Sequence, residues 1–105
     1  MVRREYDKLV RDGIPEIISG RGGRAECQYL NAEEAAEYLA MKLSEEAAEY
    51  IESREVEELA DIVEVVRGIL HHRGISWDEL ENVRQKKYAE RGGFERGIRL
   101  IAVED

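Results

Sequence analysis

KLSEEAAEYIESREVEELAD, residues 42–61, is the stretch that decides the fold, because two helical patterns meet inside it. Apolar residues from Leu39 to Tyr50 recur at the spacing of one helical face, which predicts a helix over residues 32–53. A wide apolar arc with the same period predicts a second helix over residues 54–73. The acidic residues on these two patterns decide between one long helix and a hairpin.

Two pairs of carboxylates lie three positions apart on the two patterns: Glu46 with Glu49, and Glu58 with Asp61. Residues at this spacing are neighbours on a helix surface. On the helical wheel Glu46 falls at the edge of the apolar stripe, whereas Glu58 points into the apolar arc with Asp61 beside it. An unpartnered carboxylate in such a place costs free energy or must take up a proton.

A fold-back between residues 53 and 54 brings the two pairs together. In one unbroken helix Glu46 and Glu58 would lie about 18 Å apart along the axis, at about 1.5 Å per residue. In an antiparallel hairpin Glu49 lies opposite Glu58, and Glu46 lies opposite Asp61. Converging carboxylates are the ligands that Mg²⁺ or Mn²⁺ prefers. The sequence therefore predicts a hairpin with either a metal cluster or a salt-bridged acidic surface.

Helix boundaries carry clear signals on both sides of the hairpin. The junction lacks Gly and Pro, so Ser53 is predicted to end the first helix and to cap the second. Asn31 and Glu34 form a capping pair before the first long helix. Gly74 suits the left-handed position after the second helix. A third helix is predicted to run to about residue 91, from the capping box of Ser76 and Glu79.

The ends of the chain complete the predicted fold. Pro15 falls early in a short apolar run, which predicts a short N-terminal helix within residues 6–18. Residues 24–30 and the imperfectly alternating residues 97–104 are predicted to pair as strands. The sequence thus predicts one mainly α domain over residues 1–105: an antiparallel helical hairpin and a third helix, with a small two-stranded β ribbon.

Composition limits the classes of partner. The chain has 105 residues, 38 % of them charged, and a net charge of −8, so it should repel nucleic acids and anionic membranes. Cys27 is the only cysteine, and no apolar run is long enough for a membrane span or a signal peptide. The expected compartment is the cytoplasm. Scarce Asn and Gln beside abundant Glu and Arg resemble the composition of thermophile proteins.

The acidic residues also match a family signature. Glu45-Glu46-Ala47-Ala48-Glu49 followed by Glu58-Leu59-Ala60-Asp61 resembles the E-E-x-x-E … E-x-x-D motif of the MazG-like all-α nucleoside triphosphate pyrophosphohydrolases, a superfamily that includes phosphoribosyl-ATP pyrophosphohydrolase. Residues 6–15, YDKLVRDGIP, and the late Lys86-Lys87 … Arg91-Gly92-Gly93-Phe94 resemble its small, single-domain house-cleaning branch. The similarity extends over nearly the whole chain.

The resemblance implies a hydrolase that converts a nucleoside triphosphate, standard or damaged, into the monophosphate and pyrophosphate. It implies that Glu46, Glu49, Glu58 and Asp61 bind Mg²⁺, with Mn²⁺ as a possible substitute, and that Glu45 and Glu46 take part in catalysis. It also implies a homodimer or a higher homo-oligomer. The short connection between Glu49 and Glu58 departs from most members and shortens the hairpin.

Basic residues supply the candidate substrate contacts, and each has a structural alternative. Lys8 and Arg11 suit phosphate binding or surface salt bridges. Lys86, Lys87 and Arg91 suit phosphate binding or the negative end of the third helix. Lys42 is predicted to pair with Glu46 or Glu49 more readily than to touch substrate.

Two alternative functions stay open: a phosphoribosyl-ATP pyrophosphohydrolase, and a non-catalytic acidic helical module for interaction or dimerisation.

Overall fold

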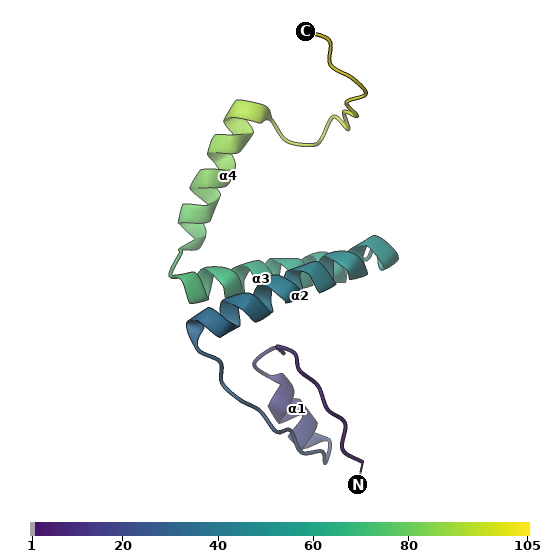
Figure 1. The fold of residues 1–105 in the computed structure, drawn as a ribbon, viewed down its shortest axis with the longest axis vertical. Helices are drawn as coiled ribbons and strands as arrows, with labels where there is room; N and C mark the ends of the chain where they lie inside the picture. The colour runs from purple at the N-terminus through teal and green to yellow at the C-terminus, as the bar shows by residue number, and fades with distance from the viewer. Residues whose placement is uncertain (1) are drawn as a thin grey trace. The chain divides into compact units, whose positions relative to one another are not determined.

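The computed structural model describes residues 2–105, which form four helices and no strand. The helices are α1 (Ile14–Gly20), α2 (Ala32–Ser53), α3 (Val56–Arg73) and α4 (Trp77–Arg91) (Figure 1). The chain separates into two compact units, Met1–Gly74 and Ile75–Asp105. The predicted all-helical core of the fold is confirmed, while the single domain over residues 1–105 stays a prediction.

Helix α2 begins where the capping pair predicts. The Asn31 side chain accepts a hydrogen bond from the Glu34 backbone N–H at 2.8 Å, and the Glu34 carboxylate accepts one from the Asn31 N–H at 3.2 Å. These two bonds satisfy backbone donors that the first turn of a helix leaves without partners. The start of α2 is therefore encoded locally, and the predicted range of residues 32–53 is confirmed.

The junction between α2 and α3 turns on a residue other than the predicted one. Arg54 adopts the left-handed conformation with φ 60° and ψ 17°, and Glu55, not Ser53, occupies the N-cap position of α3. The Ser53 hydroxyl accepts a hydrogen bond from the Glu55 N–H at 3.2 Å. The predicted Ser53 cap is wrong because two further residues, 54 and 55, are needed to reverse the chain, so α3 starts at Val56.

Helices α2 and α3 pack as an antiparallel hairpin within the first unit, side by side as Figure 1 shows. Their buried apolar side chains are Ala35, Leu39, Val65 and Leu70. Gly68 on α3 allows close approach, since a β-carbon there would lie 3.2 Å from Cδ2 of Leu39. The hairpin predicted over residues 32–73 is confirmed, and it ends at Gly74 with the expected positive φ of 66°.

The N-terminal segment and α1 belong to the same unit as the hairpin. Residues 2–11 have no regular structure, and α1 follows with Pro15 in its first turn, as predicted. The Tyr38 hydroxyl donates a hydrogen bond to Asp7 Oδ1 at 2.6 Å, which attaches the segment to α2. Arg11 attaches it to α3.

The second unit contains α4 and the residues that follow it. The Ser76 hydroxyl accepts from the Glu79 N–H at 3.1 Å, and the capping box with Glu79 predicted from the sequence is present. Helix α4 ends at Arg91, followed by Gly92 with φ 79°. Within residues 2–105, no helix combines the length and the apolar character that crossing a membrane requires.

The predicted β ribbon is wrong: neither residues 24–30 nor residues 97–104 form a strand in the described chain. The two segments belong to different compact units. A two-stranded ribbon alone is only marginally stable and needs a packed apolar face. Ile98, Leu100 and Ile101 are each about three-quarters exposed, so that packing is missing.

Candidate metal centre

Three carboxylates from the two hairpin helices converge: Glu46 from α2, and Glu58 and Asp61 from α3. Each offers an oxygen, and these oxygens all lie within 4.8 Å of one another. The convergence follows from the chain reversal at residues 54 and 55, which sets the last turns of α2 against the first turns of α3. Three of the four predicted metal ligands are thus brought together.

Glu46 is the buried member of the cluster, with 7 % of its surface exposed. Its Oε1 lies 3.5 Å from Lys42 Nζ, one helical turn earlier on α2. Its Oε2 is buried and finds no hydrogen-bond partner among residues 2–105. A buried carboxylate oxygen without a donor is costly unless the group takes up a proton or binds a cation.

The surroundings of Glu46 favour its neutral form. Burial is the main cause that raises the pKa of Glu46, and the neighbouring Glu49 carboxylate raises it further. The charge of Asp61 acts in the same direction, while the charge of Lys42 opposes it. One ammonium group therefore does not offset the carboxylates around it.

Glu58 and Asp61 are half-buried and each has one partner within the same unit. The Ser53 hydroxyl donates to Glu58 Oε1 at 3.4 Å. The Arg11 guanidinium donates to Asp61 Oδ1 at 2.6 Å. The Ser53 contact was missed by sequence reasoning, because it depends on the shape of the junction and has no motif of its own.

The donor set fits a hard divalent cation. Carboxylate oxygens are the ligands that Mg²⁺ and Mn²⁺ prefer, and Mg²⁺ commonly keeps several waters or substrate oxygens beside one or two carboxylates. Three carboxylates with one unpartnered buried oxygen meet that requirement. Salt bridges from Lys42 and Arg11 compensate the acidic charge only in part.

Glu49 and Glu45, the remaining acidic candidates, are exposed on α2. Glu49 lies close enough to Glu46 to influence its pKa, but it is not one of the three residues whose oxygens converge. Metal binding by Glu49 and catalysis by Glu45 stay predictions.

The predicted basic residues divide between the two units. Lys42 pairs with Glu46 as predicted, and Arg11 forms a salt bridge with Asp61. Lys8 is exposed on the same N-terminal segment as Arg11. Lys86, Lys87 and Arg91 lie on α4 in the second unit. Substrate contact by any of these residues stays a prediction.

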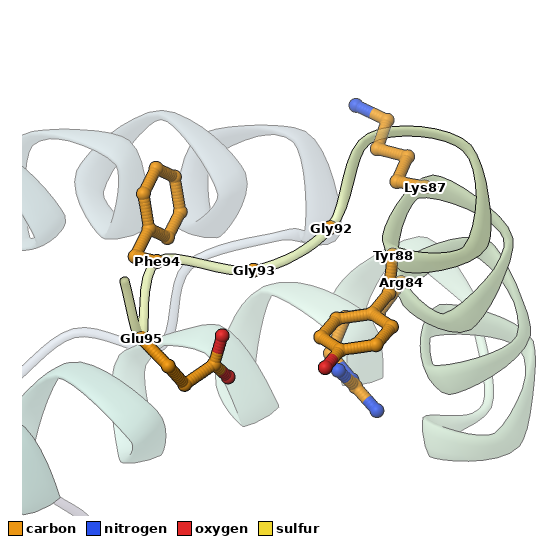
Figure 2. Close-up of a pocket in the computed structure, with 7 residues that line it drawn as sticks. All are labelled: Arg84, Lys87, Tyr88, Gly92, Gly93, Phe94 and Glu95. Carbon is orange, nitrogen blue, oxygen red and sulfur yellow. The ribbon is translucent and has the colours of Figure 1, made fainter. Parts of the chain in front are cut away.

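An open cavity of about 590 Å³ lies at the end of α4, within the second unit (Figure 2). Its lining residues are Arg84, Lys87, Tyr88, Gly92, Gly93, Phe94 and Glu95. Gly93 is tightly enclosed there, since a β-carbon on it would lie 2.9 Å from the Tyr88 ring and close to the Glu95 carboxylate. Lys87, a predicted phosphate contact, thus borders a hollow surface.

Comparisons of the chain with protein-family models, with curated proteins and with solved structures found no match.

Proposed function

We propose that this chain is a Mg²⁺-dependent pyrophosphohydrolase that cleaves nucleoside triphosphates at the α–β phosphate link. The observation that carries the proposal is the buried Oε2 of Glu46, which has no hydrogen-bond partner among residues 2–105 and lies beside the carboxylates of Glu58 and Asp61. In an ordinary salt-bridged surface, a half-exposed basic side chain would satisfy that oxygen. A divalent cation satisfies it better, because one ion contacts several carboxylates at once.

The site residues have distinct tasks in the proposed reaction. Glu46, Glu58 and Asp61 hold the cation, with Glu49 as a fourth ligand. When bound, the cation neutralises phosphate charge and orients the reacting phosphate. Glu45 takes a proton from the water that attacks one phosphorus of the α–β link, and the bond to the bridging oxygen breaks. The products are a nucleoside monophosphate and pyrophosphate.

The MazG-like resemblance supports the choice of substrate class. The E-E-x-x-E and E-x-x-D motifs contain all the acidic residues of the cluster, and the opening residues 6–15 contain Arg11, which contacts the cluster. These opening residues and the motif at Gly92 and Gly93 favour a house-cleaning enzyme over a phosphoribosyl-ATP pyrophosphohydrolase. The proposed location is the cytoplasm, where the nucleotide pool lies.

A homo-oligomer is part of the proposal because the hairpin keeps an apolar stripe exposed. Val56, Leu59 and Val63, at helical spacing on α3, are 69 %, 43 % and 47 % exposed. A stripe of this kind is typical of a face that packs against another helix. A second copy of the hairpin is the proposed occupant.

The same stripe favours the competing function, a non-catalytic acidic module that only dimerises. The two functions differ in their use of the carboxylates. A module without catalysis needs no cation at Glu46, and its dimer should form equally well in Mg²⁺ and in a chelator.

The decisive experiment is a panel of nucleoside triphosphates, standard and oxidised, incubated with the protein at several Mg²⁺ concentrations. We expect pyrophosphate and monophosphate as products, with no release after chelation. Orthophosphate and diphosphate would instead indicate cleavage at the β–γ link. Calorimetric titration with Mg²⁺ alone provides the second measurement, and the absence of saturable uptake would refute the metal centre.

A further inference from the structure

We infer that Arg11 is a built-in counter-cation of the carboxylate cluster, which a divalent ion displaces from Asp61 and which then becomes available to phosphate groups. The inference rests on the proposed function and adds an order of binding to it: the ion first, then the nucleotide. It concerns a side chain that lies outside the hairpin and reaches the cluster from the N-terminal segment.

The geometry places one carboxylate in two roles. Arg11 donates from its terminal nitrogen to Asp61 Oδ1 at 2.6 Å, across a separation of 50 positions in the sequence. Asp61 is also one of the three residues whose oxygens converge within 4.8 Å. The guanidinium therefore occupies the side of the cluster that α3 contributes.

A guanidinium and a divalent ion compete for this position. Mg²⁺ binds oxygen at about 2.1 Å, and the Arg11 nitrogen lies 2.6 Å from Asp61 Oδ1, so an ion on that oxygen would lie less than about 5 Å from the nitrogen. Like charges at that separation repel even in a well-solvated site. The Arg11 and Asp61 side chains are 55 % and 38 % exposed, so water can replace the lost contact of the arginine. Exposed ion pairs of this kind are weak.

Lys42 provides the contrast within the same cluster. Its side chain is only 20 % exposed, and it pairs with Glu46 at 3.5 Å from one turn away on the same helix. Arg11 is the more exposed of the two cations and extends from a segment without regular structure. Arg11 is therefore the cation that the divalent ion displaces, while Lys42 stays paired with Glu46 on α2.

A second contact keeps Arg11 close after it leaves Asp61. The Tyr38 hydroxyl donates to Asp7 Oδ1 at 2.6 Å, and Asp7 lies four positions before Arg11. The N-terminal segment thus stays attached to α2 when the guanidinium is released. A guanidinium held near the cluster suits bidentate binding of a phosphate, which a fixed salt bridge to Asp61 would prevent.

The first test compares Mg²⁺ affinities in the absence of nucleotide. Removing the competitor in Arg11→Gln should tighten Mg²⁺ binding about two- to fivefold, the range expected for loss of an exposed ion pair. Arg3→Gln is the matched control, because it removes the same charge from the same segment while Arg3 pairs with Glu5 and Glu26. Its affinity should stay within about twofold of the wild type. Weaker binding by Arg11→Gln would overturn the inference, since Arg11 would then support the site.

The second test follows the arginine itself in the wild-type chain by side-chain NMR, with the Arg11 resonance identified from its loss in Arg11→Gln. Saturating Mg²⁺ should move this resonance toward that of a solvated arginine, and the Arg3 resonance should not move. An unchanged Arg11 resonance at saturation would refute displacement. If neither protein takes up Mg²⁺, the proposed function fails as well; equal affinities with clear uptake refute displacement alone.

Discussion

At the scale of single residues, Glu46 and Glu58 differ from their predicted burial. The helical wheel placed Glu58 inside the apolar arc and Glu46 only at the edge of its stripe, yet Glu46 is the buried one. A wheel describes one helix and cannot show what the facing helix covers. Glu58 lies in the first turn of α3, where the positive helix end favours a carboxylate and water has access. The sequence predicts which carboxylates cluster, but it does not predict which of them is buried.

Burial of Glu46 predicts a specific pH dependence of stability without metal. The pKa of Glu46 in the folded state is raised above the ordinary 4.5. At pH values between 4.5 and the folded-state pKa, the native state therefore binds more protons than the unfolded state. The free energy of unfolding contributed by this group should therefore fall as pH rises through that window. Urea unfolding at several pH values in a chelator measures it.

Glu46→Gln should lack this contribution, since an amide does not titrate. Glu45→Gln, which changes the exposed neighbour, should keep the wild-type trend. A pH dependence that survives unchanged in Glu46→Gln would show that another group is responsible.

Glu58→Gln tests the ligand role directly. If Glu58 holds the cation, Mg²⁺ affinity and pyrophosphate release should fall together by roughly tenfold or more. Melting temperature in a chelator should hold or rise, because repulsion with Glu46 and Asp61 is relieved. The exposed Glu57→Gln serves as the control and should change neither the pyrophosphate release nor the melting temperature. Full activity of Glu58→Gln at limiting Mg²⁺ would contradict the assignment.

At the scale of helices, the first residues of α2 and α4 were more predictable than the turn between α2 and α3. Capping boxes at Asn31 and Ser76 depend on residues three apart, so a sequence shows them directly. The left-handed residue at the junction is Arg54, with no glycine or asparagine to mark it. Its backbone is held by the Arg54 N–H bond to the Tyr50 carbonyl at 2.8 Å. Tertiary packing of the hairpin, which no local signal reports, selects that conformation.

The positive φ of Arg54 predicts an inverted preference for glycine. In a helix interior alanine is more stabilising than glycine, but a left-handed position penalises any β-carbon by about 1 kcal/mol. Arg54→Gly should therefore be more stable than Arg54→Ala by about 1 kcal/mol. Both variants lose the side-chain bond from Arg54 Nε to the Ile51 carbonyl, so the comparison isolates the backbone. Equal or reversed stabilities in chemical denaturation would contradict the assigned turn.

At the scale of the whole molecule, little apolar surface is buried within residues 2–105. Only Ala35, Leu39, Val65 and Leu70 form the buried apolar set, while Phe94 is 98 % exposed. The sequence predicted enough apolar residues for a core, but composition does not say whether one chain or several chains bury them. The predicted ribbon failed for the same reason, because pairing of distant segments requires a shared packed surface.

The exposed stripe on α3 predicts a change of oligomeric state on mutation. Wild type should behave as a dimer or larger species in light scattering, and Leu59→Lys should shift it toward the monomer by placing a charge in an apolar contact. Glu64→Lys changes an exposed acidic position of the same helix and should leave the assembly intact. A wild type that is monomeric at every concentration would refute the proposed homo-oligomer.

The short junction at Arg54 and Glu55 has a consequence for synthesis of the chain on the ribosome. All residues of the carboxylate cluster, and Arg11 with them, lie before Gly74, so the first unit is complete before the second is made. Local helical hairpins form within microseconds to milliseconds, whereas translation at about 5–20 residues per second needs seconds for the remainder. The ribosomal exit tunnel covers the most recently added residues, so the acidic cluster should assemble once the first unit has emerged, through contacts that need no residue of α4.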